Sequence, residues 1–411
     1  MLEARYAFVP QPIMGKTPEQ LMDYITGTDP VTGLPVMKEI IDGLTAPIEG
    51  PLDSSLPKGI GFQRLETPRL LEPDSEDNLH AMFLENNWTD KLPIVLPTEE
   101  RVAEMLRHTK HAPDEVVGHM RPTGYREAWE YTVEKIAVNA VMAGCKPEYF
   151  PVVLALAASE TSARGSSSSS MAMMAVVNGP IRHEIDMNCG TGALGPFNHA
   201  NATIGRAYGL LSQNLQGGSV PNLTYMGSMG NNLAYNNVTF AENEERNPWE
   251  PFHVQHGFEA GQSTVSIFGG CRSTSFLLGV REQWQGQVTN MLRGMDAHSS
   301  PVFLLDPVAA QQFIDRAGFD KKEKLIQWVH ENGTMKAKEF WDNQSVVNYV
   351  YPLATYGEEP WATLLKAEPE EMIRIFPEED IHVVVVGGGT NAYWRIMAGN
   401  YRKTISIDDW R

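Results

Sequence analysis

The densest group of side chains that could do chemistry lies in the segment AENEERNPWEPFHVQH, residues 241–256. Its acids and histidines include Glu242, Glu244, Glu250, His253 and His256. Glu242 is expected at the end of a strand, and loops that follow strands commonly hold catalytic groups. Glu250 and the two histidines are also candidates for binding a divalent metal, whose identity the sequence leaves unknown. The alternative is a solvated acidic loop held by a tryptophan and two prolines.

A glycine-rich loop, GTGALG at residues 190–195, offers a second feature. Its backbone N–H groups could cradle a carboxylate or phosphate at the start of a helix. We therefore expect Gly190, Gly192, Asn198 and Asn201 to bind substrate. Glu244 of the acidic segment is expected to bind it as well. A dinucleotide site is disfavoured, because no apolar strand leads into the loop, Pro196 interrupts the helix start and no acidic residue ends a following strand. The remaining alternative is a plain tight turn.

Cys189, just before this loop, is a candidate nucleophile. A thiol next to backbone donors and a helix N-terminus has a lowered pKa. His183 and His199 are close enough in sequence to act as its base. The alternative is that Cys189 is a small buried hydrophobic residue. Cys145, at a helix end, and Cys271, after two glycines, are weaker candidates.

Glu134 lies in the most regular helical pattern of the sequence, expected over residues 128–144. Its spacing puts it on one stripe with Val138, Val141 and Cys145. A carboxylate on an apolar stripe is costly unless it is paired or functional, and burial would raise its pKa toward the range used in acid–base catalysis. The alternative is a glutamate that borders the core and pairs with Lys or Arg.

Four of these residues form the expected catalytic set: Glu134, Cys189, Glu242 and His253. We expect Glu134, the glycine loop and the acidic segment to converge on one pocket. Such a pocket would combine an acid–base group, a seat for an anion and a titratable histidine.

The elements that must position these residues alternate between helices and strands. Helices are expected near residues 19–26, 36–44, 98–108, 128–144, 148–159 and 200–215, and strands near 171–180, 237–242 and 263–268. After about residue 281 come four further helical patterns and then IHVVVVGGGTN, an apolar strand followed by three glycines. This loop lacks the Lys-Ser/Thr of a P-loop, so a strand and a flexible turn are the simpler interpretation.

The pattern predicts an α/β fold with a mixed sheet core flanked by helices, an irregular N-terminal arm and a mainly helical C-terminal region. The expected regions are an arm over residues 1–97, a core with the candidate active site over 98–280, and a helical region ending in a Gly-rich strand and loop over 281–411. A long irregular arm is hard to bury on its own lobe, which favours a homo-oligomer, most simply a homodimer.

The composition excludes several classes of partner and site. The formal net charge is −18 at pH 7, so nucleic acid is not an expected partner. No stretch approaches 18 apolar residues and no secretory leader is visible, so a membrane span is not expected. The three cysteines form no C-x-x-C pair, which argues against a Cys₄ zinc site and for a reducing, cytoplasmic location. The G-x-S-x-G elbow of α/β-hydrolases is absent.

Long stretches of the chain carry a family resemblance. They are TVEKIAVNAVMAGCKPEYFPVVLA, VNGPIRHEIDMNCGTGALGPFNHANATIGRA, AENEERNPWEPFHVQHGF and the tail IHVVVVGGGTNAYW. With them the chain resembles an uncharacterised bacterial family whose members occur beside, or fused to, a small protein with a (seleno)Cys-Gly-Ser-Cys motif, the UGSC type. The resemblance implies a companion in thiol redox chemistry, and this chain has no Cys-Gly-Ser-Cys of its own.

These residues predict an enzyme acting on a small polar, carboxylated molecule, of lyase or thiol-linked reductase type. It would use acid–base carboxylates and the anion-binding Gly/Asn loop, and its cofactors are unknown. The expected partners are the small-molecule substrate and a small thiol redox protein. The alternative is a non-catalytic binding or partner subunit of a redox system.

Overall fold

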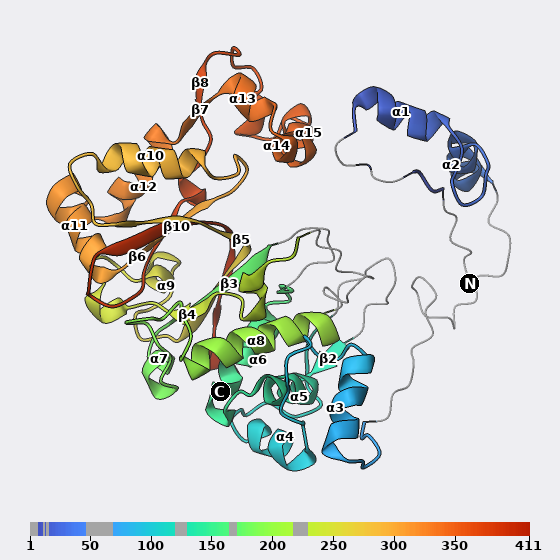
Figure 1. The fold of residues 1–411 in the computed structure, drawn as a ribbon, viewed down its shortest axis with the longest axis vertical. Coiled ribbons are helices and arrows are strands. Elements are labelled where there is room, and N and C mark those ends of the chain that lie inside the picture. The colour runs from blue at the N-terminus through green and yellow to red at the C-terminus, as the bar shows by residue number, and fades with distance from the viewer. Residues whose placement is uncertain are drawn as a thin grey trace. The chain divides into compact units, whose positions relative to one another are not determined.

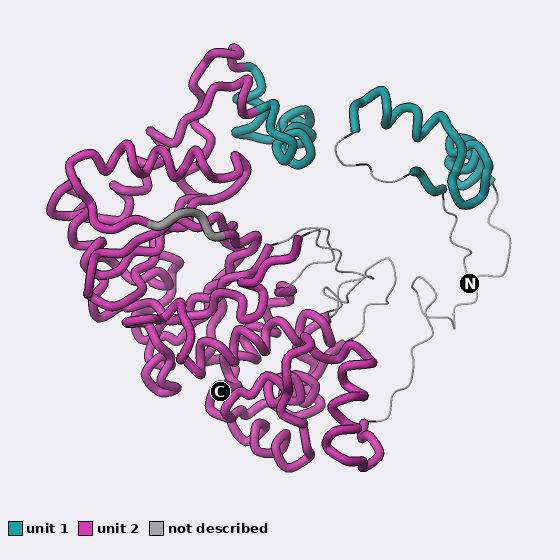
Figure 2. The backbone as a smooth tube through the Cα atoms, in the orientation of Figure 1, with its two compact units in different colours: residues 1–66, 341–366 teal, residues 67–340, 367–411 magenta. Residues whose placement is uncertain are grey.

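The computed structural model describes residues 7–10, 13, 16–46, 69–119, 130–163, 171–216 and 229–411, with backbone only at 273–276. Contacts divide the chain into two compact units (Figure 2). The small unit is residues 1–66 and 341–366, and the large unit is residues 67–340 and 367–411. Residues 47–68 of the expected arm and residues 128–129 of the expected helix lie outside the described residues.

The elements of the two units are as follows. The large unit has helices α3 Glu76–Glu85, α4 Glu99–Leu106, α5 Val133–Ala143, α6 Phe150–Ala158, α7 Ile181–Glu184, α8 His199–Asn214, α9 Phe252–Gln255, α10 Trp284–Arg293, α11 Pro307–Ala317 and α12 Lys322–Asn332, and α13 Ala337–Trp341 crosses into the small unit. Its strands are β1 Val116–His119, β2 Glu130–Thr132, β3 Ala172–Asn178, β4 Thr239–Ala241, β5 Thr264–Leu278, β6 Pro301–Leu305, β7 Thr334–Lys336, β8 Met372–Arg374, β9 His382–Val385 and β10 Tyr393–Ser406. Its 3₁₀ turns are η1 Pro147–Tyr149, η2 Asn232–Tyr235, η3 Glu244–Arg246, η4 Glu378–Asp380 and η5 Asp408–Trp410. The small unit has α1 Pro18–Thr26, α2 Val36–Thr45, α14 Gln344–Tyr349, α15 Tyr351–Thr355 and α16 Trp361–Leu364. Within the described residues, no helix has the length and apolar character needed to span a membrane.

The central sheet of the large unit has six strands in the order β4-β3-β5-β10-β6-β9 (Figure 1). The outer pairs β3–β4 and β6–β9 are parallel, whereas the long β5 and β10 are antiparallel to their neighbours. The β5–β10 register shifts at three points, and such bulges bend strands. The two edges of the sheet approach each other, since the N–H of Asn243, after β4, donates to the carbonyl of Val385 in β9 over 2.8 Å. The prediction of an α/β fold with a mixed, helix-flanked sheet is confirmed.

Apolar side chains cover both faces of β3. Ala175 and Val177 pack with the helices α5, α6 and α8, whereas Met174 and Val176 pack on the other face with Phe252 and other residues. Successive side chains of a strand point to opposite faces, so a strand that is buried on both reads as an unbroken apolar run. This explains why the pattern at residues 171–180 predicts the strand correctly.

Helix α5 begins later than the pattern predicts. Residues Glu130–Thr132 form β2, which pairs antiparallel with β1, and the helix starts at Val133. It ends where predicted, because Gly144 adopts a left-handed conformation with φ 85° that favours glycine. The helix α4, expected over residues 98–108, is capped by Thr98, whose side chain accepts the N–H of Arg101.

The three expected regions do not coincide with the units of the structure. Residues beyond 281 supply β6, β9 and β10 to the same sheet that contains β3, β4 and β5, so 281–411 is not a separate helical region. Residues 69–97 belong to the large unit, where Phe83 of α3 joins the core. The four helical patterns after residue 281 are local and easily read, whereas strand pairing across the chain leaves no local signal.

The helices α1 and α2 of the small unit are well capped but little buried. The side chains of Thr17 and Gln20 form a reciprocal capping box at the start of α1. The helix α1 buries no residue and α2 buries only Val36. Their exposed apolar side chains are Met22, Ile25, Met37, Ile40, Ile41 and Leu44.

Candidate functional site

The segments after β3, β4 and β9 meet where the edges of the sheet approach each other. We call this place the loop junction and define it as residues 178–191, 242–247 and 386–391. The N–H of Gly387 donates to the carbonyl of Cys189 over 2.8 Å, and the Asn243 side chain donates to the carbonyl of Gly387 over 2.9 Å. The two glycine-rich segments, far apart in the sequence, therefore lie against each other.

Glycines allow this close approach. A Cβ atom at Gly388 would lie 2.1 Å from the hydroxyl oxygen of Thr191 and 3.0 Å from its Cα. A Cβ atom at Gly389 would lie 2.1 Å from Nη2 of Arg246. The segment GGGTN is thus packed against the first glycine loop and against an arginine, which is more than the simple turn that its sequence suggests.

Glu242 is fully buried at the centre of the loop junction. Its Oε2 accepts hydrogen bonds from the side chain of Asn178 and from the N–H of Phe252, both over 2.7 Å. Its Oε1 accepts from the side chain of Asn247 over 2.9 Å and lies 3.7 Å from Nζ of Lys322. Because the chain itself occupies both oxygens, we assign Glu242 to positioning the loops, not to the catalytic contact expected from the sequence.

Lys322, the first residue of α12, is a member of the site that the sequence does not reveal. Its side chain is 1% exposed, and Nζ donates to Oε1 of Gln255 over 3.2 Å. Burial lowers the pKa of the Lys322 ammonium, and the charge of Glu242 opposes this shift. Lys322 stands among Lys321 and Lys324, and no local pattern distinguishes the buried lysine from its exposed neighbours.

Arg182 is the buried cation of the loop junction, with a side chain that is 4% exposed. Its Nη2 lies 3.1 Å from a carboxylate oxygen of Glu244 and 2.9 Å from one of Glu245. Hydrogen bonds from Arg182, and then from His183, lower the pKa of Glu245 to about 2 although burial opposes them. Nε2 of His183 lies 2.8 Å from Glu245 on the exposed side. Arg182, Glu245 and His183 therefore form a hydrogen-bonded row that leads from the buried guanidinium to the exposed imidazole.

Glu244 was expected to bind substrate, and the structure gives its oxygens other partners. Its Oε1 accepts hydrogen bonds from the Asn178 side chain and from the N–H of Gly179, each over 2.8 Å. Its Oε2 pairs with Arg182. Glu244 therefore fastens the end of β3 to the loop after β4.

Cys189 lies in the loop junction, half-buried, but its environment differs from the expected one. Burial raises the pKa of the Cys189 thiol, and the neighbouring Arg182 guanidinium opposes the shift only in part. The expectation of a lowered pKa is therefore wrong, because the side chain packs against the apolar core under the helices. Burial also raises the pKa of the thiols of Cys145 and Cys271 to about 12, so these two are inert core residues.

The amides of the first glycine loop shape the loop itself. Asn198 donates to the carbonyls of Gly192 and Gly195 over 2.7 and 2.9 Å. Asn201 donates to the carbonyls of Ala193 and Asn188 over 3.1 and 2.9 Å. Both asparagines were expected to bind substrate, and these bonds make them positioning residues instead.

Gly192 and Gly190 of the same loop differ in conformation and in contacts. Gly192 has φ 74°, in the left-handed region that favours glycine, and is exposed with open space around it. The N–H of Gly190 donates to the Asn188 side chain over 2.8 Å. The loop therefore presents its outer edge, at Gly192, to solvent.

Glu134 does not join the loop junction. Gly144, at the end of α5, lies beside Thr203 near the start of α8, and Asn139 receives a hydrogen bond from Asn214 at the end of α8. The two helices are therefore antiparallel, and Glu134 is about 15 Å along α5 from the end that approaches the glycine loop. It forms a two-point ion pair with Arg69, over 2.5 and 3.1 Å. The expectation that Glu134 shares one pocket with the other residues is wrong, and its pairing with an arginine is the alternative stated above.

The candidate metal ligands do not come together. His253 is fully buried, and neither ring nitrogen has a hydrogen-bond partner among the described residues. The ring of His256 stacks on Tyr401, with centroids 4.3 Å apart, and Glu250 is exposed. Across the described part of the chain, no three His, Cys, Asp or Glu side chains form a group that could hold a metal ion. His253, expected in the catalytic set, is buried in α9 next to Phe252, whose N–H donates to Glu242.

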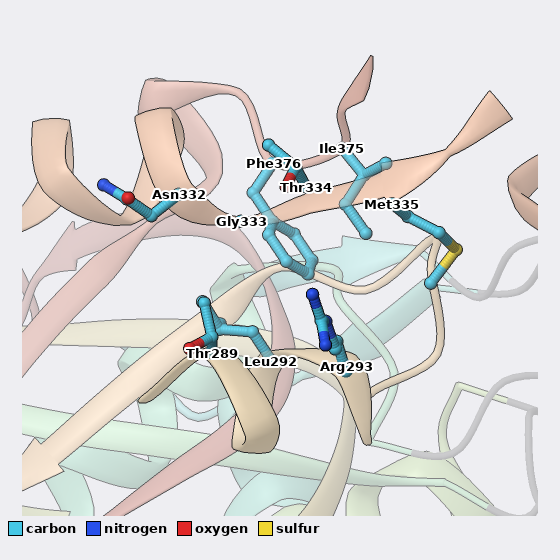
Figure 3. A pocket seen from close by; sticks show the side chains of 9 residues that line it. All are labelled: Thr289, Leu292, Arg293, Asn332, Gly333, Thr334, Met335, Ile375 and Phe376. Atoms are coloured by element: carbon cyan, nitrogen blue, oxygen red, sulfur yellow. The ribbon is translucent and has the colours of Figure 1, made fainter. Parts of the chain in front are cut away.

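Two cavities of the large unit are lined by residues outside the loop junction. One is lined by α10, the end of α12, β7 and the chain after β8, and includes Arg293 and Phe376 (Figure 3). Its volume of about 10 Å³ has room for about one water molecule. The other, of about 430 Å³, lies between α3 and residues 89–94. Neither is lined by a residue of the loop junction.

Comparisons of the chain with protein-family models, with curated proteins and with solved structures give no match. The side chains and backbone of the loop junction are therefore the basis for assigning a function.

Proposed function

We propose that the chain is an enzyme that acts on a small polar, carboxylated molecule at the loop junction, with lyase or thiol-linked reductase chemistry. The observation that carries this proposal is the meeting of two glycine segments at Cys189, beside the row formed by Arg182, Glu245 and His183. Backbone N–H groups and an arginine suit a carboxylate, and a histidine paired with a carboxylate suits proton transfer.

The exposed His183 and the half-buried Cys189 have separate roles in this proposal. His183, oriented by Glu245, removes or delivers the proton of the substrate. Cys189 supplies a thiol; burial raises its pKa, and the Arg182 guanidinium opposes this rise in part. In the reductase form of the chemistry, a small dithiol protein of the kind that the family resemblance implies supplies the electrons and becomes a disulfide. Glu242 and Glu244 hold the loops in place through their hydrogen bonds, and thereby position the reacting groups.

The proposal is tested by assaying the purified full chain against small hydroxy- and dicarboxylic acids, with and without a reduced small dithiol protein. Turnover by the wild type should fall at least about a hundredfold in His183→Gln, the usual scale for a general acid–base group. Cys189→Ser separates the two chemistries, since it abolishes only the thiol-linked one. The matched control is His108→Gln, an exposed histidine beyond α4 with no role in the junction. Turnover that is insensitive to both junction variants would contradict the proposal.

The raised pKa of Cys189 favours a second candidate, a non-catalytic partner subunit of a redox system. A thiol that stays protonated at neutral pH reacts slowly without help. In this case the chain alone has no turnover, and activity appears only when the dithiol companion is added. Titration calorimetry with the companion alone would then show direct binding. The three free cysteines also fit the proposed reducing, cytoplasmic location.

We also propose that the protein is a homodimer that uses α1 and α2. Met37, Ile40, Ile41 and Leu44 of α2 follow the i, i+3, i+4, i+7 spacing of one helix face, and all four are exposed. Helices this short are marginal in water unless an apolar face is packed. A second copy of the same face is the simplest cover, because a two-fold contact is self-complementary.

A further inference from the structure

Arg246, the last residue of η3, is exposed and has no ion-pair partner among the residues that the structure describes. The carboxylates closest to it in the sequence have other partners. The adjacent Glu244 and Glu245 are paired with Arg182, and Glu245 also contacts His183. The positive charge of Arg246 is therefore available to an anion from solution, and a guanidinium binds carboxylate or phosphate oxygens in a two-point geometry.

The guanidinium lies directly on the second glycine segment. A Cβ atom at Gly389 would lie 2.1 Å from Nη2, and 2.6 Å from both Nη1 and Cζ of Arg246. One residue earlier, Gly388 touches Thr191 of the first glycine loop. Arg246, the second glycine segment and Thr191 are thus adjacent in space, although they come from three separate parts of the sequence.

The same place offers further unused donors. The N–H groups of Gly388 and Gly389 and the hydroxyl of Thr191 have no hydrogen-bond partner within the described parts of the chain. Backbone N–H groups of consecutive residues, with a hydroxyl and an arginine, are a recurrent means of holding an oxyanion.

We propose that Arg246, the N–H groups of Gly388 and Gly389 and the hydroxyl of Thr191 form a seat for a carboxylate or phosphate group of the substrate. The proposal deepens the function proposed above and rests on it only for the claim that the bound anion belongs to a substrate. It also gives Gly388 and Gly389 a chemical role, because a side chain at position 389 would displace the guanidinium from the backbone.

The test is titration calorimetry of the full chain with two probes, malonate and inorganic phosphate, which separate carboxylate from phosphate recognition. We expect at least one probe to bind the wild type, and Arg246→Gln to weaken that binding at least about tenfold. Gly389→Ala should also weaken it, because the methyl group displaces the guanidinium while its charge remains. The control is Arg293→Gln, an exposed arginine of the small cavity in Figure 3 that likewise has no described ion-pair partner, and its binding should equal that of the wild type.

Three outcomes would overturn the seat: neither probe binds the wild type, Arg246→Gln binds as the wild type does, or Arg293→Gln weakens binding as much as Arg246→Gln. Circular dichroism of each variant checks that folding is retained. If a small carboxylic acid is turned over with a KM unaffected by Arg246→Gln, the seat is wrong and the proposed function stands. If the probes bind through Arg246 but no carboxylic acid is turned over, the seat stands and the proposed function is wrong.

Discussion

The buried pair of Glu242 and Lys322 allows a direct test of what holds the loop junction together. Glu242→Gln removes the charge and replaces one acceptor oxygen by an N–H donor. Whichever way the new amide turns, its donor faces other donors, either those of Asn178 and Phe252 or that of Asn247. The substitution also leaves the Lys322 ammonium buried without its counter-charge.

The magnitudes follow from these contacts. Removing one partner of a buried ion pair costs roughly 3–5 kcal/mol, and we expect Glu242→Gln to lower the free energy of unfolding by about 4 kcal/mol. Lys322→Met should lower it by only about 1–2 kcal/mol, because Glu242 keeps its hydrogen bonds while the cost of burying the ammonium disappears. In the double variant no buried charge remains, so its loss should be smaller than the sum of the single losses by about 1.5 kcal/mol or more.

Urea unfolding of the full chain at pH 7, followed by tryptophan fluorescence and circular dichroism, measures the three losses. The matched control is Lys324→Met, which removes a lysine of the same helix whose partner Asp320 is on the surface. An exposed pair of this kind is screened by solvent, so Lys324→Met should unfold much as the wild type does. Losses that add within about 0.5 kcal/mol, or a Lys322→Met loss equal to that of Glu242→Gln, would refute the reasoning.

Three further predictions concern other parts of the chain. The burial that raises the pKa of Cys189 should make its alkylation by iodoacetamide slow at pH 7 and faster as the pH rises past 9.0, and a fast reaction at pH 7 would contradict this. Both ring nitrogens of His111 lie 2.8 Å from acceptors, the Asp409 carbonyl and the Glu115 carboxylate, and the bond to Asp409 is the main cause that raises the His111 pKa. The stabilisation by protonated His111 should therefore be complete below about pH 6.5 and should disappear as the pH rises through the raised pKa of His111. Thermal unfolding measured against pH should show this loss in the wild type and not in His111→Gln. Sedimentation should give a dimer for the wild type and a monomer for Leu44→Glu, and a wild-type monomer at micromolar concentration would rule out the proposed dimer.

The sequence predicts well the elements whose signals are local. Thr98 caps α4 because its hydroxyl is next to the free N–H groups of the first turn, and Gly144 ends α5 because it can adopt a left-handed conformation. The apolar run of β3 predicts a strand buried on both faces. Each of these effects is decided within about four residues, so the order of the residues is enough to anticipate it.

The loop junction is only partly predictable. The sequence singles out Cys189 and Glu242 but does not bring Gly387 to Cys189, because that contact depends on the curl of a six-stranded sheet. The burial of Lys322 and the pairing of Glu134 with Arg69 depend on distant segments in the same way. The pKa of Cys189 was expected to fall and instead rises, because the packing around a thiol counts for more than its distance in sequence from a helix start.

The contact between Asn243 and Val385 bears on how the protein behaves at high concentration. The edge strands β4 and β9 have only three and four residues, and this hydrogen bond draws their ends together. An exposed strand edge is a template on which other chains pair and aggregate. Short edge strands whose ends are hydrogen-bonded to each other offer few free backbone groups for such pairing. Variants that loosen the contact are therefore expected to precipitate at concentrations at which the wild type stays in solution, even where the cores on both faces of the sheet remain packed.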